Sequence, residues 1–129
     1  MKKLLFLISL IFSGLSVSAQ APDTESVIDA LEAGNASDLV ALCIPNLDLD
    51  VMGKDDVYSR AQAEQILKKF FDVNDPSNFS TEHNGVSKTG DHYVIGKLST
   101  SGGDKRVTFF QKKVSGKYLV KQLRIEASR

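Results

Sequence analysis

Cysteine and histidine are scarce in this chain of 129 residues, and each shortage excludes a class of protein. The single cysteine, Cys43, cannot form an internal disulfide, so the fold does not depend on one. Cys43 follows Leu39 by one helical turn, which favours a buried thiol over a nucleophile. The two histidines, His83 and His92, have no H-E-x-x-H motif or cysteine pair beside them. The sequence therefore predicts no metal site and no cofactor.

Catalytic fingerprints are also lacking. There is no serine-hydrolase, phosphate-loop or dinucleotide motif, and "SGGD", residues 101–104, has the composition of a hairpin turn. Asp48 and Asp50 alternate with leucines, so their carboxylates should point away from the core. Since no acid is clearly placed in an apolar pocket, the sequence assigns no catalytic residue. It favours a non-enzymatic protein over a small isomerase- or hydrolase-like enzyme with a carboxylate in a pocket.

The apolar run of residues 4–12 is too short for an ordinary membrane span, which needs about 20 residues. Two lysines precede the run and small residues follow it, the layout of a secretory signal peptide over residues 1–19. We expect cleavage before Gln20; the alternatives are cleavage after Ala21, which would leave Pro22 first, and a retained anchor. The predicted product is exported to the periplasm or the extracellular space, is not membrane-spanning, and forms a single domain over residues 20–129.

Excess charge of one sign is absent after cleavage, because 14 basic and 16 acidic residues leave a formal charge of −2. This balance argues against nucleic acid as a partner. The charges are nevertheless uneven, with 12 acids and 4 bases in residues 20–75 but 2 acids and 9 bases in residues 97–129. Such blocks either orient encounters with a partner or solvate two faces of the molecule.

Two short helices are predicted at the start of the mature chain. Asp23 or Thr24 can cap the first, and Gly34 can end it in a left-handed conformation. Asn35 or Ser37 can cap the second. The apolar positions of the second helix are Leu39, Val40 and Cys43, and Pro45 should stop it.

The clearest helix covers residues 59–71. Ser59 and Gln62 form a capping box, in which each side chain satisfies a free backbone N–H of the first turn. Apolar residues recur at helical spacing along one side of this segment, namely Ala63, Ile66, Leu67, Phe70 and Phe71. This stripe needs a surface to pack on, and the predicted sheet supplies it.

The strands are predicted from the alternation of apolar and polar residues. Leu47, Leu49 and Val51 alternate with aspartates, and "GKDD", residues 53–56, indicates a turn. Four further strands cover residues 79–88, 92–101, 105–114 and 117–128, separated by short turns. Two to three helices and an antiparallel meander define an α+β architecture with the helices on one face of the sheet.

The last two strands carry apolar side chains on both faces. We expect Leu119, Leu123 and Ile125 on one face, interrupted by Lys121, and Tyr118, Val120 and Phe110 on the other. A second subunit covering the second face would make a homodimer through the sheet. The alternative is that these are ordinary strand residues on a solvated face.

The order of elements and the stretches "VYSRAQAEQILKKFF", "HYVIGKLSTSGG" and "GKYLVKQLRIE" resemble a family of small secreted bacterial proteins known as a domain of unknown function. The resemblance covers residues 23–126. It implies the nuclear transport factor 2-like (cystatin-like) fold, a curved sheet wrapping a helix into a cone. That superfamily includes isomerases, dehydratases, polyketide cyclases and non-catalytic binding domains, so the fold alone does not select a function.

Polar side chains set among apolar strand residues are the candidates for a ligand site at the mouth of the cone. They are Tyr58, His83, Tyr93, Gln122 and Arg124. The predicted function is an exported non-enzymatic binding or interaction module for a small molecule, a peptide or a protein. The alternatives are the enzyme described above and a homo-oligomeric structural component.

Overall fold

The computed structural model describes residues 21–128, and the predicted signal peptide of residues 1–19 lies outside this range. The helices are α1 (Thr24–Ala33), α2 (Ala36–Ala41) and α3 (Arg60–Val73). The strands are β1 (Cys43–Val51), β2 (Lys54–Ser59), β3 (Pro76–Val86), β4 (His92–Thr100), β5 (Lys105–Val114) and β6 (Lys117–Ala127). The α+β prediction is confirmed.

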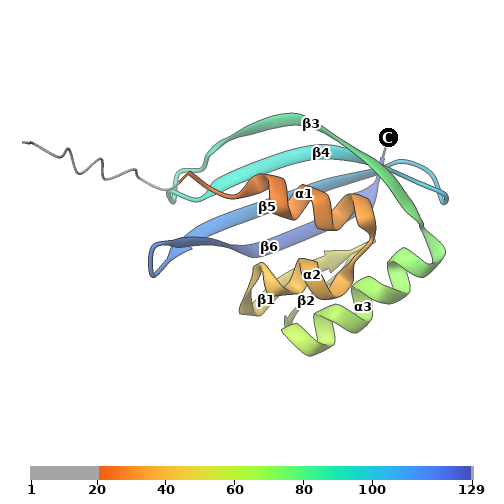
Figure 1. Ribbon diagram of the computed structural model, residues 1–129, viewed down its shortest axis with the longest axis horizontal. Coiled ribbons are helices and arrows are strands. Elements are labelled where there is room, and N and C mark those ends of the chain that lie inside the picture. Colours follow the sequence, from red (N-terminus) through yellow and green to blue (C-terminus); the bar gives the residue numbers. More distant parts are fainter. Residues whose placement is uncertain (1–20, 129) are drawn as a thin grey trace, which may run out of the picture.

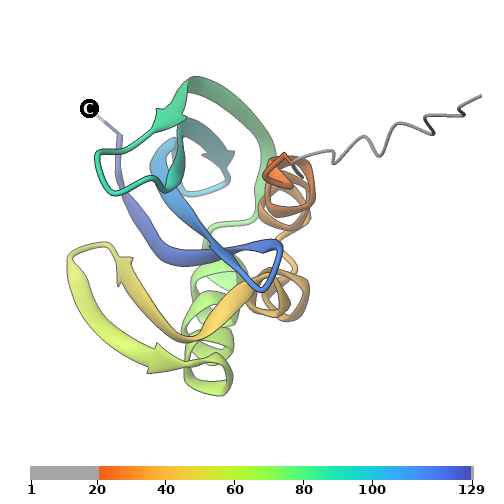
Figure 2. The same ribbon diagram turned by 90° about the vertical axis from the view of Figure 1, so that its left-hand side faces the viewer.

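The six strands form one curved sheet in the order β2-β1-β6-β5-β4-β3, with all three helices against one face (Figure 1). Figure 2 shows the sheet nearly end-on, with α1 and α2 on one side of it. β3 to β6 form the predicted antiparallel meander, whereas β1 pairs with β6 in parallel. The parallel pair was not predicted, because it joins segments about 75 residues apart in the chain.

The helix caps agree with the sequence. Asp23 caps α1 and Asn35 caps α2, while Gly34 ends α1 with a φ of 64°. Ser59 and Gln62 form both hydrogen bonds of the capping box at the start of α3. These local signals require only a few neighbouring residues, which is why the sequence shows them clearly.

The core fills the space between the helices and the sheet. Four residues of the predicted stripe of α3 are buried, and Ile66 is half-buried. α3 packs on β1, β2 and α2, while α1 covers β3 and β4. The helix of residues 59–71 therefore fills only part of the concave side. Arg60 fastens its first turn to the sheet by donating two hydrogen bonds to the carbonyl oxygen of Cys43, at 3.0 and 2.6 Å.

Three local predictions are wrong. Cys43 begins β1 instead of continuing α2, which ends at Ala41, and Pro45 lies inside the strand. Proline is tolerated there because the β1 and β6 registers shift between Cys43 and Asp48, so its missing N–H breaks no ladder bond. The turn predicted over residues 53–56 is instead Met52 and Gly53, and β2 already begins at Lys54.

A bulge in β6 overturns the predicted faces of that strand. Phe110 pairs with Gln122, but the next residue, Gln111, pairs with Val120. The extra residue lets Val120 and Leu123 both lie in the core, with Lys121 turned out of it. The prediction that Val120 lies with Phe110 on an exposed face is therefore wrong.

Gly96 on β4 makes a close approach that a larger residue would block. A Cβ atom there would lie 2.4 Å from the ring of Phe79 and 2.6 Å from the carbonyl oxygen of Ser80, both on β3. Phe79 is thereby able to lie across β4 and close the end of the core.

We expect Gly96→Ala to lower the free energy of unfolding by about 2 kcal/mol, because the ring and the neighbouring strand must both move. Chemical denaturation measures the change. In a Phe79→Leu background the same substitution should cost less, since the shorter side chain vacates part of the space. Equal costs in the two backgrounds would show that the ring is not the obstacle.

Candidate functional site

Four of the five candidate residues lie on the sheet face opposite the helices, which we term the outer face. The strand registers align its side chains in rows across the sheet. The first row is Gly85, Tyr93, Phe110, Gln122, Asp48 and Val57. The second row is His83, Ile95, Thr108, Arg124, Asp50 and Asp55. The sequence places these candidates at the mouth of the cone, whereas the structure brings four of them together on the outer face of the sheet.

The centre of the outer face is aromatic and apolar. The rings of Tyr93 and Phe110 are neighbours in the first row, with centroids 6.0 Å apart and planes inclined at 41°. Ile95 lies in the next row, and all three side chains are half-buried. Aromatic side chains with part of their surface exposed are characteristic contact residues at interfaces.

Carboxylates and a guanidinium group lie side by side at the β1 and β2 end of these rows. Burial raises the pKa of Asp48, and a hydrogen bond with Asp55 adds to this effect. Arg124 opposes it, and its Nε lies 3.6 Å from Oδ2 of Asp50. That Nε is buried yet has no hydrogen-bond partner among the described residues. This part of the face therefore combines a carboxyl that resists ionisation with an unsatisfied donor.

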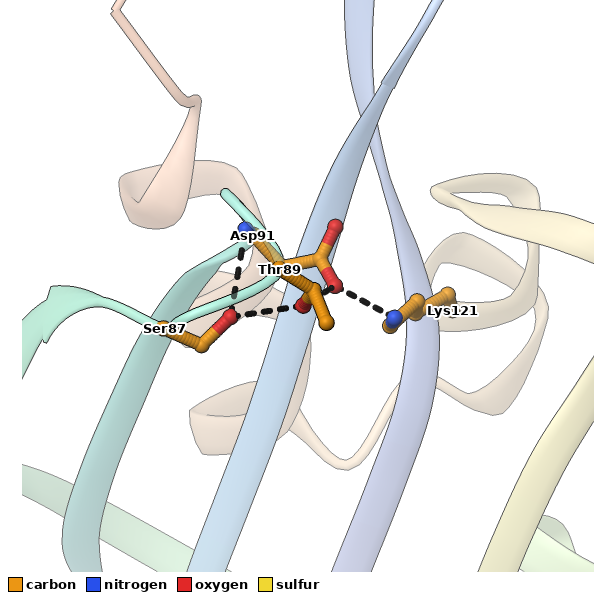
Figure 3. Close-up of polar contacts among 4 residues, drawn as sticks. All are labelled: Ser87, Thr89, Asp91 and Lys121. Carbon is orange, nitrogen blue, oxygen red and sulfur yellow. Dashed lines mark hydrogen bonds and ion pairs between the residues drawn. The ribbon is translucent and has the colours of Figure 1, made fainter.

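A polar cluster forms the other end of the outer face, where Asp91 reaches across β5 to Lys121 on β6 (Figure 3). The Thr89 hydroxyl donates to Oδ2 of Asp91 at 2.7 Å, and the Asp91 N–H donates to Oγ of Ser87 at 3.2 Å. The hydrogen bond from Lys121 lowers the pKa of Asp91; burial opposes this shift, and the Thr89 hydroxyl adds to it. Asp91 is only 8% exposed, so the cluster fastens the β3–β4 turn to β6.

One feature of the sequence points to this cluster. Lys121 interrupts the apolar alternation of β6, and an interruption by a cation indicates either a bulge or a buried partner. The partner itself could not be identified, since Asp91 is 30 residues away in the chain.

Tyr58 does not join the outer face. It pairs with Leu47, whose side chain is in the core, and lies on the helix side of β2. There it lines an open groove with Ile66 and Phe70 of α3. Tyr58 therefore belongs to a separate surface.

The two histidines are also separated. His83 lies in the second row of the outer face, whereas His92 shares a row with Gln111 and Val120, both buried against the helices. Within residues 21–128, no group of three or more histidine, cysteine, aspartate or glutamate side chains is arranged to hold a metal ion. Cys43 is fully buried, and this burial raises its pKa to about 12, so the thiol stays protonated in the folded protein.

The fold places the protein among the α+β domains of cystatin-like and nuclear transport factor 2-like type. A domain of unknown function with a cystatin-like fold from Nostoc punctiforme PCC 73102 matches at a TM-score of 0.65, with 13% identity over 82% of this chain and 73% of that one. A de novo designed protein with a curved β-sheet matches at 0.65, with 13% identity over 81% and 95%. At these identities the likeness concerns the fold alone.

Within this fold, the sequence assigns the chain to one family. Residues 24–126 match the family described as "Domain of unknown function (DUF4783)", and the chain belongs to it. A crystal structure of a member from Bacteroides ovatus ATCC 8483 is similar at a TM-score of 0.76, with 30% identity over 86% of this chain and 98% of that one. No curated protein matches the chain. Among residues 21–128, no helix combines the length and apolar character needed to cross a membrane.

The Asp91 and Lys121 pair predicts a pH dependence of stability. Folding lowers the pKa of Asp91 below its ordinary value of 3.8, so the pair stabilises the folded state above that value and ceases to do so as the pH falls through the lower, folded-state pKa. We expect Asp91→Asn to lower the free energy of unfolding by about 1 kcal/mol at neutral pH and by much less in acid.

Urea denaturation of both proteins from neutral to acid pH measures this difference. The control is Asp104→Asn, because Asp104 lies 3.9 Å from Lys97 and both side chains are exposed, so its removal should cost little at any pH. A constant Asp91→Asn effect across the range would exclude the ion pair as its source.

Proposed function

We propose that this protein is an exported, non-enzymatic interaction module that binds a polypeptide partner through its outer face. The observation that supports the proposal is the pair of rows in which Tyr93, Ile95 and Phe110 form a half-buried centre between charged groups. An apolar centre with a charged surround is the anatomy of protein interfaces. The face is a broad sheet surface, whereas small-molecule sites are concave.

The enzyme alternative requires a carboxyl with a raised pKa inside the cone. Asp48 has the raised pKa, but its side chain belongs to the outer face. Asp91 is more buried, yet its pKa is lowered by Lys121. The side chains between the helices and the sheet form an apolar core, including Leu49, Leu67 and Leu123. Binding at the surface therefore has more support than catalysis in the interior.

A second copy of the chain is the first partner to consider. On the outer face, Asp48, Asp50 and Asp55 lie toward β1 and β2, while Lys97 and Arg106 lie on β4 and β5. A two-fold axis lying in the interface, parallel to the strands, would set the acidic half of one copy against the basic half of the other. This arrangement would use the uneven charge distribution already evident in the sequence.

Photo-crosslinking tests the binding proposal. We expect p-benzoylphenylalanine at position 110 to form an adduct in cells that export the protein, because the ring would lie in the interface. The same residue at position 86 is the control, since Val86 is 68% exposed at the end of β3 and outside the two rows. An adduct of twice the chain mass identifies self-association. Equal yields at the two positions, or none at either, would contradict the proposal.

The proposed export leads to a separate prediction. The mature protein recovered outside the cytoplasm should begin at Gln20, because small residues precede that bond and the lysines precede the apolar run. Intact-mass measurement and N-terminal sequencing locate the cleavage site. A protein that retains residues 1–19 and sediments with membranes would support the retained anchor instead.

A further inference from the structure

A second surface, on the opposite side of the sheet, has the features of a binding groove. It lies between the C-terminal half of α3 and the turn that joins β1 to β2, elements that meet at the same end of the molecule (Figure 1). The groove has a volume of about 470 Å³, and Ile66 and Phe70 contribute to its mostly apolar lining. We term it the α3 groove.

Two of the most exposed large apolar side chains border the α3 groove. Met52 is 47% exposed and Val73 is 74% exposed. Single exposed apolar residues are ordinary, but two beside one apolar groove form a continuous patch, and such patches mark interaction sites. Methionine suits this role because its flexible side chain adapts to different partners.

The backbone at Met52 is costly for the free protein. Met52 and Gly53 have φ values of 55° and 92°, the type I′ arrangement, in which asparagine or aspartate normally precedes glycine. A methionine in the left-handed region is strained. Met52 thus lowers the stability of the free protein in two ways, through its strained backbone and through its exposed apolar side chain. Strain of this kind, combined with exposure beside a groove, points to a function for the side chain.

The charge of the α3 groove limits what can bind there. Lys54 and Lys69 line it, and no aspartate or glutamate does. Neither lysine takes part in an ion pair within residues 21–128. The complementary ligand has an apolar group between negative charges.

The neighbouring strand indicates the form of that ligand. β2 is an edge strand of the sheet. The N–H groups of Val57 and Ser59 already donate to side chains, namely those of Asp56 and Gln62. The part of the β2 backbone that an extended segment can pair with is therefore the end next to the groove, at Lys54 and Asp55. A segment paired with β2 would direct alternate side chains toward α3. The groove is open, so the rest of the segment could remain outside it.

We propose that the α3 groove binds an extended acidic segment of another polypeptide, with an apolar side chain on Ile66 and Phe70 and acidic side chains at Lys54 and Lys69. Met52 and Val73 close over the apolar side chain from either side. This site does not depend on the outer face, so either proposal can fail without the other.

The test uses the protein labelled at its methyl groups and a pentapeptide, Glu-Thr-Leu-Thr-Glu with blocked ends. In an extended conformation the leucine and both glutamates of this peptide share one side. We expect saturable NMR shifts of the Met52, Ile66 and Val73 methyl groups, and much weaker ones with Lys-Thr-Leu-Thr-Lys. The absence of saturable shifts at the solubility limit, or equal shifts with both peptides, would overturn the proposal.

Two other occupants are distinguished in the same experiment. Shifts at these methyl groups that depend on protein concentration without peptide would assign the groove to a second copy of the chain. Tighter saturation by decanoate than by the acidic peptide would assign it to a small amphiphilic acid. Either result would overturn the assignment to a polypeptide segment.

The turn residues supply a matched pair of variants. Met52→Asn should raise the melting temperature by about 4 °C, because asparagine tolerates the left-handed conformation, and should weaken peptide binding about tenfold. Ser115→Asn is the control, since Ser115 and Gly116 form the same kind of turn between β5 and β6, with φ values of 50° and 85°. It should stabilise the protein without changing peptide binding.

Unchanged peptide affinity in Met52→Asn would overturn the role of Met52. A third variant, Lys69→Gln, separates charge from packing. It should weaken binding of the acidic peptide while leaving that of a neutral Gln-Thr-Leu-Thr-Gln peptide unchanged, and equal effects on both peptides would contradict the role assigned to the lysine.

Discussion

The parallel pairing of β1 with β6 joins two halves of the molecule. One half is the β1–β2 hairpin with α3, and the other is the meander of β3 to β6. Without this pairing, the β1–β2 hairpin and α3 would pack against α2 but would not join the meander. Leu49 of β1 and Leu123 of β6 are partners in this pair and are fully buried, so the pairing also joins the two halves of the core. Because the partners are far apart in the chain, forming this contact requires the closure of a long loop, which slows folding.

The two surfaces proposed for binding both result from this arrangement. All three helices pack on one face of the sheet, so the other face keeps its aromatic and charged side chains without cover from the described residues. The helices share their face unevenly, and α3 lies only over β1 and β2. Its C-terminal half therefore borders the β1–β2 turn, which leaves the apolar α3 groove at that edge. The same packing that stabilises the core thus creates two surfaces of different chemistry.

Local features could be predicted from the sequence, and features that combine distant segments could not. The caps at Asp23, Asn35 and Ser59 depend on residues only three positions away, so they could be predicted from the sequence. The face of Val120 was predicted wrongly because a single bulge reverses alternation for every residue beyond it. His83, Tyr93, Gln122 and Arg124 were recognised as a group by their chemistry, but the side of the sheet they occupy depends on which face the helices cover. Asp91 acquires its partner only through the register of three strands.

Cys43 gives the protein an internal reporter of its own unfolding. It is the single thiol, it lies at the junction of α2 and β1, and its Sγ is within 3.3 Å of the carbonyl oxygen of Leu39. A protonated, fully buried thiol reacts slowly with thiol reagents, so labelling requires the junction to open. The rate of alkylation therefore measures how often the first helical pair separates from the sheet, with no added probe. In an oxidising compartment, the same protection prevents mixed disulfides while the fold is intact.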